Sequence, residues 1–279
     1  MKRVLLTLIL CTSSVGTLAD DPYDALLDLS GARIQLGELP PGALDQIRAL
    51  GLFPDVVASE IHQASQQTRA NVIEDIKRAL RSGLAPDEID ELLTWYRSDL
   101  AKKVTQAEIR GQLQGMPDDE TQSQLLKDTS RRQQVEKMIR VMNSVALSES
   151  FAYSFTVSLL AAASALNDQE FNKREFDDQW PWIIASQTGQ IEHVLLVLTL
   201  QSLAPLDDVE VDAYFKFLET PTSMKFHSII VEEFEASFSR QIWDFLVEVQ
   251  TIVTTHGLTE PLTERANAAS PPPQGNTSP

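Results

Sequence analysis

Four histidines are the side chains of this sequence best suited to metal binding or proton transfer: His62, His193, His227 and His256. None belongs to a metal-binding spacing such as His-Glu-x-x-His, or to the Glu-x-x-His pairs of di-iron helical bundles. Glu192 is adjacent to His193, and a helix would point the two in different directions. We therefore expect no metal site and no catalytic site built on histidine.

Pairs of acidic residues are numerous, and paired carboxylates can do acid–base chemistry where a cleft shifts the pKa of one of them. The pairs are Asp118-Asp119, Asp177-Asp178, Asp207-Asp208 and Glu232-Glu233. We expect most of them to begin helices or to lie on solvated faces. The sequence also has no Gly-x-Ser-x-Gly nucleophile elbow and no glycine-rich phosphate loop. These residues predict no recognisable enzyme and no cofactor.

Aromatic and basic residues supply the candidates for binding. Trp180 and Trp182 flank Pro181, and they are the best candidates for an exposed apolar patch. Positive charge is concentrated between residues 97 and 140, where it would contact an acidic partner or the protein's own acidic surface. Its candidate contact residues are Lys102, Lys103, Arg131 and Arg132. The other aromatic residues are expected in the core, or in a groove that grips an apolar peptide or lipid tail.

The overall charge limits the partners. The 279 residues include 23 Lys and Arg against 40 Asp and Glu, a net charge of −17. This balance argues against nucleic acid, whose phosphates need a basic surface, and against docking on anionic lipid. A hydrophobic content of 43% predicts a folded protein, and the length permits a core that needs no disulfide.

The first residues predict export. Lys2 and Arg3 precede a short apolar run from Val4 to Cys11, and small residues lead to a cleavage site near Ala19-Asp20. Residues 1–19 are therefore predicted to be a signal peptide, with the mature protein periplasmic or secreted. Cys11, the single cysteine, is removed with it, which excludes disulfides, thiol catalysis and thiolate metal sites in the mature chain.

The remaining pattern predicts an all-α protein of about ten helices. Residues 118–147 contain no Gly or Pro and predict one long helix or two abutting helices. Residues 150–166 carry no charge; at 17 residues they are short for a membrane span and predict a central helix covered on all sides. Pro181 is expected to start a helix after a polar connection at 167–178. Residues 20–41 are expected to be mostly irregular, with a short extended piece around Ala32 to Leu36, and 263–279 to be a disordered tail.

An internal repeat emerges when the chain is compared with itself at an offset of 122 residues. Residues 88–104 then align with 210–226, so that Glu88 meets Glu210 and Lys103 meets Lys225. Trp95 meets Phe217, and Ser98 meets Thr220, at a position suited to a helix N-cap. Pro221 follows at the first helical position. The pattern predicts two related helical units, 42–117 and 118–262, in which Trp95 and Phe217 pin paired helices together.

The segments LLTWYRSDLAKK and FKFLETPTSMK, which carry this repeat, resemble a helical domain of unknown function found in many exported bacterial proteins. That family has a helix ending in an aromatic residue, then Ser/Thr-Pro, a Gly and a Lys-rich helix. Asp99 replaces its proline in the first copy, and Ala101 and Ser223 replace its glycine. The resemblance implies a helical fold and an exported location, and no particular activity.

Together these observations predict a non-enzymatic binding or protein-interaction module of the cell envelope, with a protein partner and no integral membrane span in the mature chain. The alternative is a carrier or chaperone-like protein that holds an apolar ligand or peptide between helices. An enzyme without a recognisable motif is the third hypothesis.

Overall fold

The computed structural model describes residues 21–34, 57–166 and 171–256, and within these ranges its regular structure is helical throughout. This confirms the all-α prediction. The predicted signal peptide and the tail at 263–279 lie outside the described residues. The ten helices of seven residues or more are α1 (Pro22–Leu29), α3 (Ala58–Gly83), α4 (Pro86–Tyr96), α5 (Asp99–Gln114), α6 (Asp119–Leu125), α7 (Thr129–Val141), α8 (Ser144–Leu166), α9 (Lys173–Leu203), α10 (Asp208–Leu218) and α11 (Pro221–Thr255).

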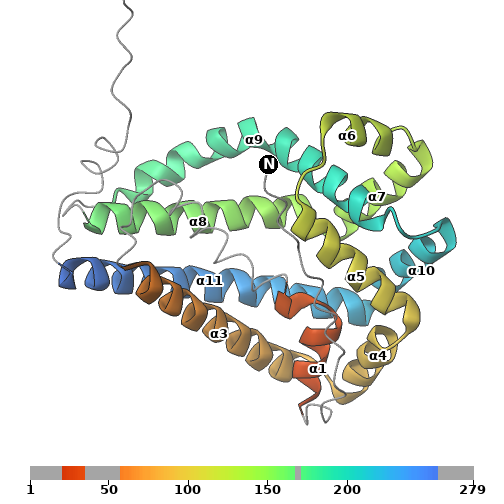
Figure 1. Ribbon diagram of the computed structural model, residues 1–279, viewed down its shortest axis with the longest axis horizontal. Coiled ribbons are helices and arrows are strands. Elements are labelled where there is room, and N and C mark those ends of the chain that lie inside the picture. The colour runs from red at the N-terminus through yellow and green to blue at the C-terminus, as the bar shows by residue number, and fades with distance from the viewer. Residues whose placement is uncertain (1–20, 35–56, 167–170, 257–279) are drawn as a thin grey trace, which may run out of the picture.

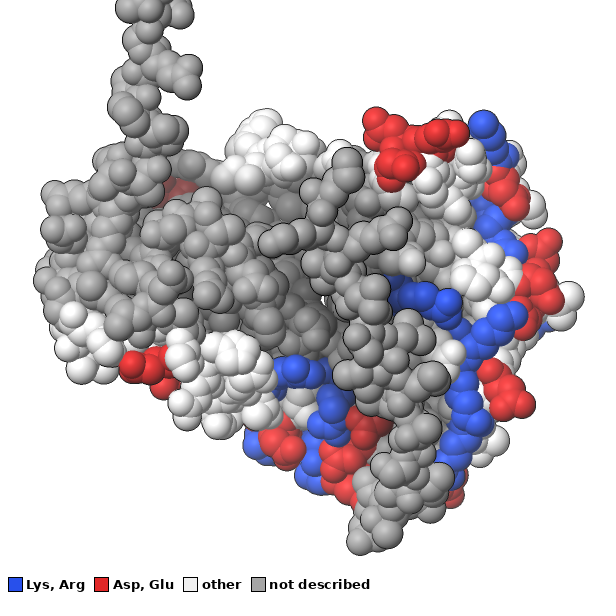
Figure 2. All heavy atoms as spheres, in the orientation of Figure 1, with Lys and Arg blue, Asp and Glu red and all other residues white. Residues whose placement is uncertain are grey.

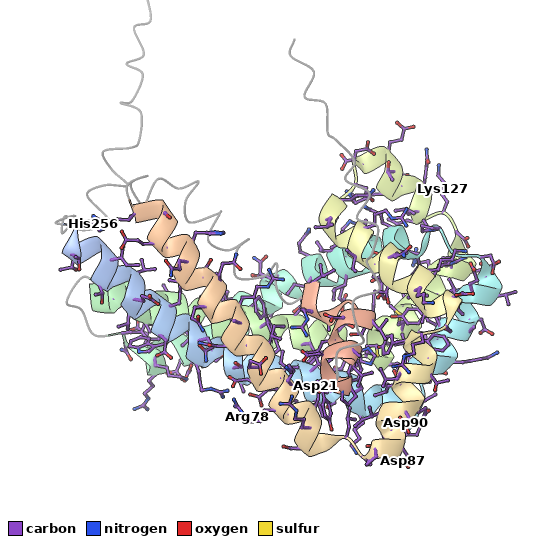
Figure 3. All side chains as sticks on the ribbon, turned by 60° about the horizontal axis from the view of Figure 1, so that its bottom comes forward. Asp21, Arg78, Asp87, Asp90, Lys127 and His256 are labelled. Carbon is purple, nitrogen blue, oxygen red and sulfur yellow. The ribbon has the colours of Figure 1, made fainter. Side chains whose placement is uncertain are left out.

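Two long antiparallel helices, α3 and α11, form one side of the molecule (Figure 1). Hydrogen bonds join them along their length, from His256 Nε2 and Glu60 Oε1 at 2.8 Å to Ser237 Oγ and Asp75 Oδ2 at 2.6 Å. Figure 3 shows the same pair from another side, with His256 at the end of α11. Helix α8 packs on α11 and α9 packs on α8, while the shorter helices gather at the other end.

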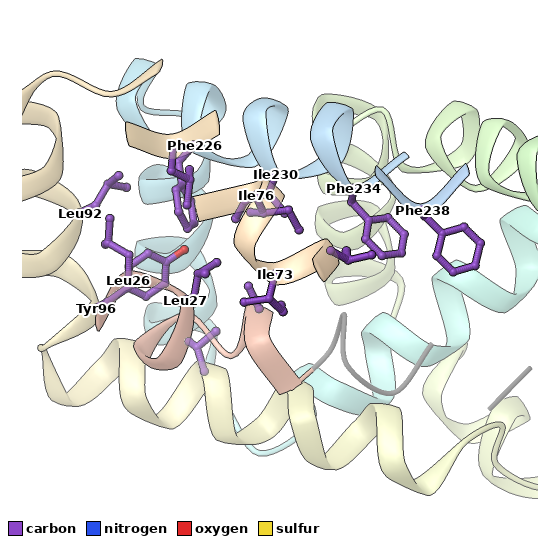
Figure 4. Packing of buried hydrophobic residues seen from close by; sticks show 14 of the residues in the cluster. Leu26, Leu27, Ile73, Ile76, Leu92, Tyr96, Phe226, Ile230, Phe234 and Phe238 are labelled. Atoms are coloured by element: carbon purple, nitrogen blue, oxygen red, sulfur yellow. The ribbon is translucent and has the colours of Figure 1, made fainter. Parts of the chain in front are cut away.

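The core is continuous through the described residues. Helix α11 contributes an apolar stripe at helical spacing, and its members Phe226, Ile230, Phe234 and Phe238 are all buried. Figure 4 shows this stripe against side chains of α1, α3 and α4. Buried residues of α1, α3, α4, α5, α7, α9, α10 and α11 belong to one cluster, so these helices share a core.

Residues 20–41 were predicted to be mostly irregular, and for Pro22–Leu29 this is wrong. Asp21 caps α1 by accepting a hydrogen bond from the Tyr23 N–H at 3.1 Å, and Pro22 occupies the first turn. Leu26 and Leu27 are completely buried. The predicted extended piece is also wrong for residues 32–34, which form a helical turn. Helix α1 is stabilised because Leu26 and Leu27 pack in the core.

Lys77 of α3 fastens α1 to the core. Its Nζ lies 2.9 Å from Asp24 Oδ2, and the Lys77 side chain is almost fully buried. Burial acts to raise the pKa of Asp24, but hydrogen bonds from Lys77 and Arg33 outweigh it and lower that pKa. A buried lysine needs such a partner, because an unpaired charge away from water is very costly.

Residues 118–147 form more helices than expected. Asp128 caps α7 by accepting from the Arg131 N–H, and Asn143 has a left-handed backbone (φ 51°) between α7 and α8. Asparagine tolerates this conformation, so it can break a helix without Gly or Pro. The prediction that residues 150–166 are covered on all sides is wrong: the described side chains there are half-buried or exposed, as at Leu160.

Helix α9 begins earlier than predicted and contains Pro181 in its interior. Asn172 caps it by accepting from the Glu175 N–H, so residues 173–178 are helical and not a polar connection. Pro181 has no N–H to donate to Asp177, and an internal proline bends a helix; Figure 1 shows α9 as an arch over α8. Among the described helices, α9 alone is long and apolar enough to cross a membrane by length and composition.

In two helical hairpins, α4–α5 and α10–α11, the bounds of the first helix and the start of the second match at the offset of 122 residues. Pro86–Tyr96 corresponds to Asp208–Leu218, and Asp99 corresponds to Pro221. The long helix that precedes each hairpin packs on the other hairpin. Helix α3 precedes α4–α5 and packs on α11, and helix α9 precedes α10–α11 and packs on α5.

Candidate functional site

A cavity of about 500 Å³, here called the main cavity, lies where the two hairpins meet α7, α8 and α9. Its volume is in the range of small-molecule sites. Most of its lining is apolar, from residues that include Trp95, Val104, Met138, Leu195 and Phe226.

An acid–phenol pair is the main polar feature of this wall. Tyr214 of α10 donates a hydrogen bond from its hydroxyl to Glu108 Oε1 of α5 at 2.6 Å. Glu108 is half-buried by accessible surface because its open side lines the cavity, while protein atoms surround its carboxyl group densely. Burial raises the pKa of Glu108, and the hydrogen bond from Tyr214 only partly opposes this. Burial also raises the pKa of Tyr214.

Tyr96 and His227 add two further polar groups. Tyr96 is buried, its pKa is raised by burial, and among the described residues its hydroxyl has no hydrogen-bond partner. The His227 Nδ1 lies 2.8 Å from the carbonyl oxygen of Ser223, to which it donates in the neutral tautomer. Burial lowers the pKa of His227. Burial thus favours the neutral imidazole, in which Nε2 is a hydrogen-bond acceptor.

A second space of about 270 Å³, the outer pocket, adjoins the main cavity. The two share Met142, His227 and Val231, so these three side chains form the partition between them. Met224 and Glu232, which also line the outer pocket, are exposed or nearly so. The outer pocket is therefore a partly open space that adjoins the main cavity at these three side chains.

The chemistry available in the main cavity is hydrogen bonding and proton exchange within an apolar chamber. Its described lining contains Glu108 and His227 as titratable groups beside the two tyrosines, and no Lys or Arg. No group of three or more His, Cys, Asp or Glu suited to a metal ion occurs among the described residues.

Of the residues of the predicted repeat turn, Trp95 lines this cavity. Trp95 stacks on Phe217 with ring centroids 4.3 Å apart and planes 10° apart. Ser98 caps α5 by accepting from the Ala101 N–H at 3.1 Å, and Thr220 caps α11 by accepting from the Ser223 N–H at 3.2 Å. The described partners are those expected of helix caps.

Two ion pairs cross between the hairpins. Lys103 Nζ lies 2.5 Å from Glu210, and Lys225 Nζ lies 2.6 Å from Glu88. Hydrogen bonds from these lysines lower the pKa of each glutamate. Each glutamate also accepts a backbone N–H at the start of its helix, Glu88 from Ala85 and Glu210 from Asp207. The pairs fix how the hairpins sit against each other.

The cation candidates contact the protein's own acids. Arg131 Nη2 lies 2.6 Å from Asp208 and 3.1 Å from the carbonyl oxygen of Leu206, where it closes the turn between α9 and α10. Lys102 pairs with Asp99 at 3.5 Å, and Arg132 pairs with Glu136 at 2.8 Å. Figure 2 shows basic and acidic side chains interleaved on this part of the described surface. The structure does not gather these cations into a single patch.

The two candidate tryptophans are in different surroundings. Trp180 packs on Tyr153 of α8 at 5.4 Å in an edge-on geometry and on Phe176 at 5.5 Å. Trp182 is 82% exposed, and Ile183 beside it is 42% exposed. The exposed apolar position is therefore Trp182 with Ile183, while Trp180 joins α9 to α8.

Sequence reasoning missed Glu108, Tyr96 and Tyr214, and it assigned no role to His227. One signal was present: Glu108 lies at helical spacing from Ala101, Val104 and Thr105, on the buried stripe of α5. A charged residue on an apolar stripe indicates a buried acid. Comparisons with family models, with curated proteins and with solved structures found no match, so the resemblance to an exported bacterial family stays a prediction.

Proposed function

We propose that the protein is a carrier that holds a small, largely apolar ligand in the main cavity. The observation that carries the proposal is an apolar chamber of about 500 Å³ with a few polar groups on its wall. Such a lining is typical of small-molecule sites, where apolar surface gives affinity and isolated polar groups orient the ligand. This was the alternative hypothesis from the sequence.

The surroundings of the cavity support exchange of a ligand. Met138 and Met142 line it, and methionine adapts to guests of different shape. The outer pocket shares its partition with the main cavity through Met142, His227 and Val231. Rotation of these side chains would join the two spaces without unfolding a helix.

A fluorescence experiment tests the proposal. N-phenyl-1-naphthylamine, an uncharged apolar dye, is expected to bind the purified protein and to brighten. Val231→Phe should weaken its binding about tenfold by filling the partition, whereas Val247→Phe on an exposed position of the same helix should have no effect. Equal binding by both variants would overturn the assignment of the site. Native mass spectrometry of the protein as purified would identify a resident ligand.

We also propose export. The positive and apolar segments before Ala19-Asp20 support a signal peptide, and the first capped helix starts directly afterwards at Asp21. Sequencing the N-terminus of the secreted or periplasmic protein should find Asp20 as the first residue. An intact N-terminus would contradict this.

A protein partner is a second candidate function, and the exposure of Trp182 beside Ile183 favours it. Large exposed aromatic side chains are enriched in protein interfaces. Capture from an envelope extract should recover a stoichiometric partner, and Trp182→Ala should abolish the capture. Recovery that is equal with both proteins would exclude this surface.

Finally, we propose that the α4–α5 and α10–α11 hairpins are related copies. Their matching bounds, equivalent caps and reciprocal ion pairs support this. Relatives with higher similarity between the two segments would strengthen the proposal, and relatives that lack one hairpin would contradict it.

A further inference from the structure

At the position that corresponds to Glu108, the other hairpin has an apolar residue. The residue 122 positions after Glu108 is Ile230, and the residue 122 positions before Tyr214 is Leu92. Both are buried core residues of the other hairpin (Figure 4). The acid–phenol pair is therefore not required for two helices to pack here, and its presence calls for another physical reason.

The half-buried carboxyl group of Glu108 has one polar partner among the described residues. Tyr214 donates to Oε1, and among the described residues Oε2 has no hydrogen-bond partner. No Lys or Arg belongs to the described lining of the cavity. A carboxylate removed from water without a cation loses hydration that one hydroxyl does not replace. The carboxyl group consequently takes up a proton more readily than an exposed one, as the direction of its pKa shift indicates.

The walls around Glu108 complement a positive charge. Four aromatic side chains, Trp95, Tyr96, Tyr214 and Phe226, line the same cavity. The face of an aromatic ring attracts a cation, and the attraction grows when water is excluded. The neutral His227 adds a hydrogen-bond acceptor and no competing charge.

We infer that the ligand of the main cavity is an organic amine, whose ammonium group pairs with the Glu108 carboxylate while its apolar body fills the rest of the chamber. This inference rests on the proposed carrier function. An ammonium group would pair with Oε2, which has no partner among the described residues, and would favour the ionised form of Glu108. A ligand carboxylate would instead meet Glu108 as a like charge, and an alcohol would gain only a neutral hydrogen bond. The acidic surface of the protein, with its net charge of −17, also draws cations toward it.

Three probes with one tail separate these cases: n-decylamine, n-decanol and n-decanoate, each titrated into the purified protein by displacement of the fluorescent dye at pH 7. Decylamine should bind at least about tenfold more tightly than either of the others, the difference that a charge-assisted hydrogen bond provides. Glu108→Gln keeps the acceptor for Tyr214 but cannot ionise. It should weaken decylamine about tenfold, leave decanol unchanged and relieve the disadvantage of decanoate.

The outcomes distinguish the amine from the carrier. If decanol or decanoate binds wild-type protein as tightly as decylamine, the amine inference is wrong and the carrier function stands. If decylamine binds most tightly but Glu108→Gln changes nothing, the inference is also wrong, because the ammonium group then contacts a residue other than Glu108. If neither the dye nor any probe binds, the carrier function itself fails. Where Glu108→Gln does not fold, the wild-type ranking still tests the inference, because decanol or decanoate binding as tightly as decylamine overturns it.

Discussion

Trp95 stacks face to face on Phe217, the residue 122 positions further along the chain, with ring centroids 4.3 Å apart. The same offset relates the bounds of α4 and α10 and the starts of α5 and α11, and it exchanges the ion pair Lys103–Glu210 with Lys225–Glu88. The contact therefore marks a place where the two hairpins meet, beside the main cavity that Trp95 lines.

Truncating this contact should cost much of the stability of the protein. Phe217 is buried, so Phe217→Ala is expected to lower the free energy of unfolding by about 3–5 kcal/mol. Trp95 is half-buried, so Trp95→Ala should cost less. Urea denaturation of both variants and the double variant should give a coupling of about 0.5–1.5 kcal/mol. Trp182→Ala, at an exposed site, is the control and should change stability by less than about 0.5 kcal/mol.

Exchanging the positive and negative residues of one ion pair between the hairpins should preserve much of its contribution to stability. Lys103→Glu places two acids together and should lower the thermal midpoint modestly, because both side chains are partly solvated. Adding Glu210→Lys should restore part of the loss. The restoration should shrink in 1 M salt, where surface charges are screened. A double variant no more stable than the single one would show that the pair contributes through packing alone.

The buried carboxyl group should make stability depend on pH in a defined direction. Because the pKa of Glu108 is raised above its ordinary value of 4.5, the folded state binds a proton that the unfolded state has lost. Stability is then full below the ordinary pKa and falls as pH rises toward the raised one. Chemical denaturation at pH 4 and pH 8 should show Glu108→Gln gaining on wild type as pH rises.

The other titratable groups at this site do not obscure the comparison. Tyr214, Tyr96 and His227 face the same cavity from α10, α4 and α11, and all three are present in both proteins. Their contributions cancel in the difference between wild type and Glu108→Gln, apart from their coupling to Glu108. A difference independent of pH would contradict the buried acid.

A glycine in α5 should prove intolerant of a side chain. A Cβ on Gly111 would meet the hydroxyl of Ser202 in α9 and lie 2.9 Å from its Cβ and 3.1 Å from its Cα. Gly111→Ala should therefore destabilise the protein, by about 1–3 kcal/mol as overpacking does, with partial rescue by Ser202→Gly. Gly83→Ala should cost less, because the obstacle there is the flexible end of Ile229. Thermal unfolding of the three variants ranks them.

The parts of this fold that depend on local chemistry could be predicted from the sequence. Pro86, followed by Asp87 and Glu88, marks the start of α4, and Thr220 before Pro221 marks the start of α11. The class of the fold follows from such signals repeated along the chain. Pro181 was misleading, because proline is common at the start of helices, whereas Pro181 lies inside α9.

The cavity could not be predicted because no local pattern describes it. Glu108 and Tyr214 are separated by 106 positions, and only the packing of α5 against α10 brings them together. The burial of the uncharged segment at 150–166 could not be predicted from composition either. Its composition predicts burial, whereas the burial of α8 depends on how the arched α9 packs on it.

The packing of α3 on α11, which are far apart in the sequence, affects when the protein can fold during its synthesis. Glu60 of α3 bonds to a residue 196 positions later, and Asp75 to one 162 positions later. During synthesis from the N-terminus, the apolar stripe of α3 leaves the ribosome long before α11 exists to cover it. Native structure must wait until the last helix has been translated, since the contacts that reward ordering α3 are so distant along the chain. Until then that stripe is exposed, so we expect the incomplete chain to be prone to aggregation.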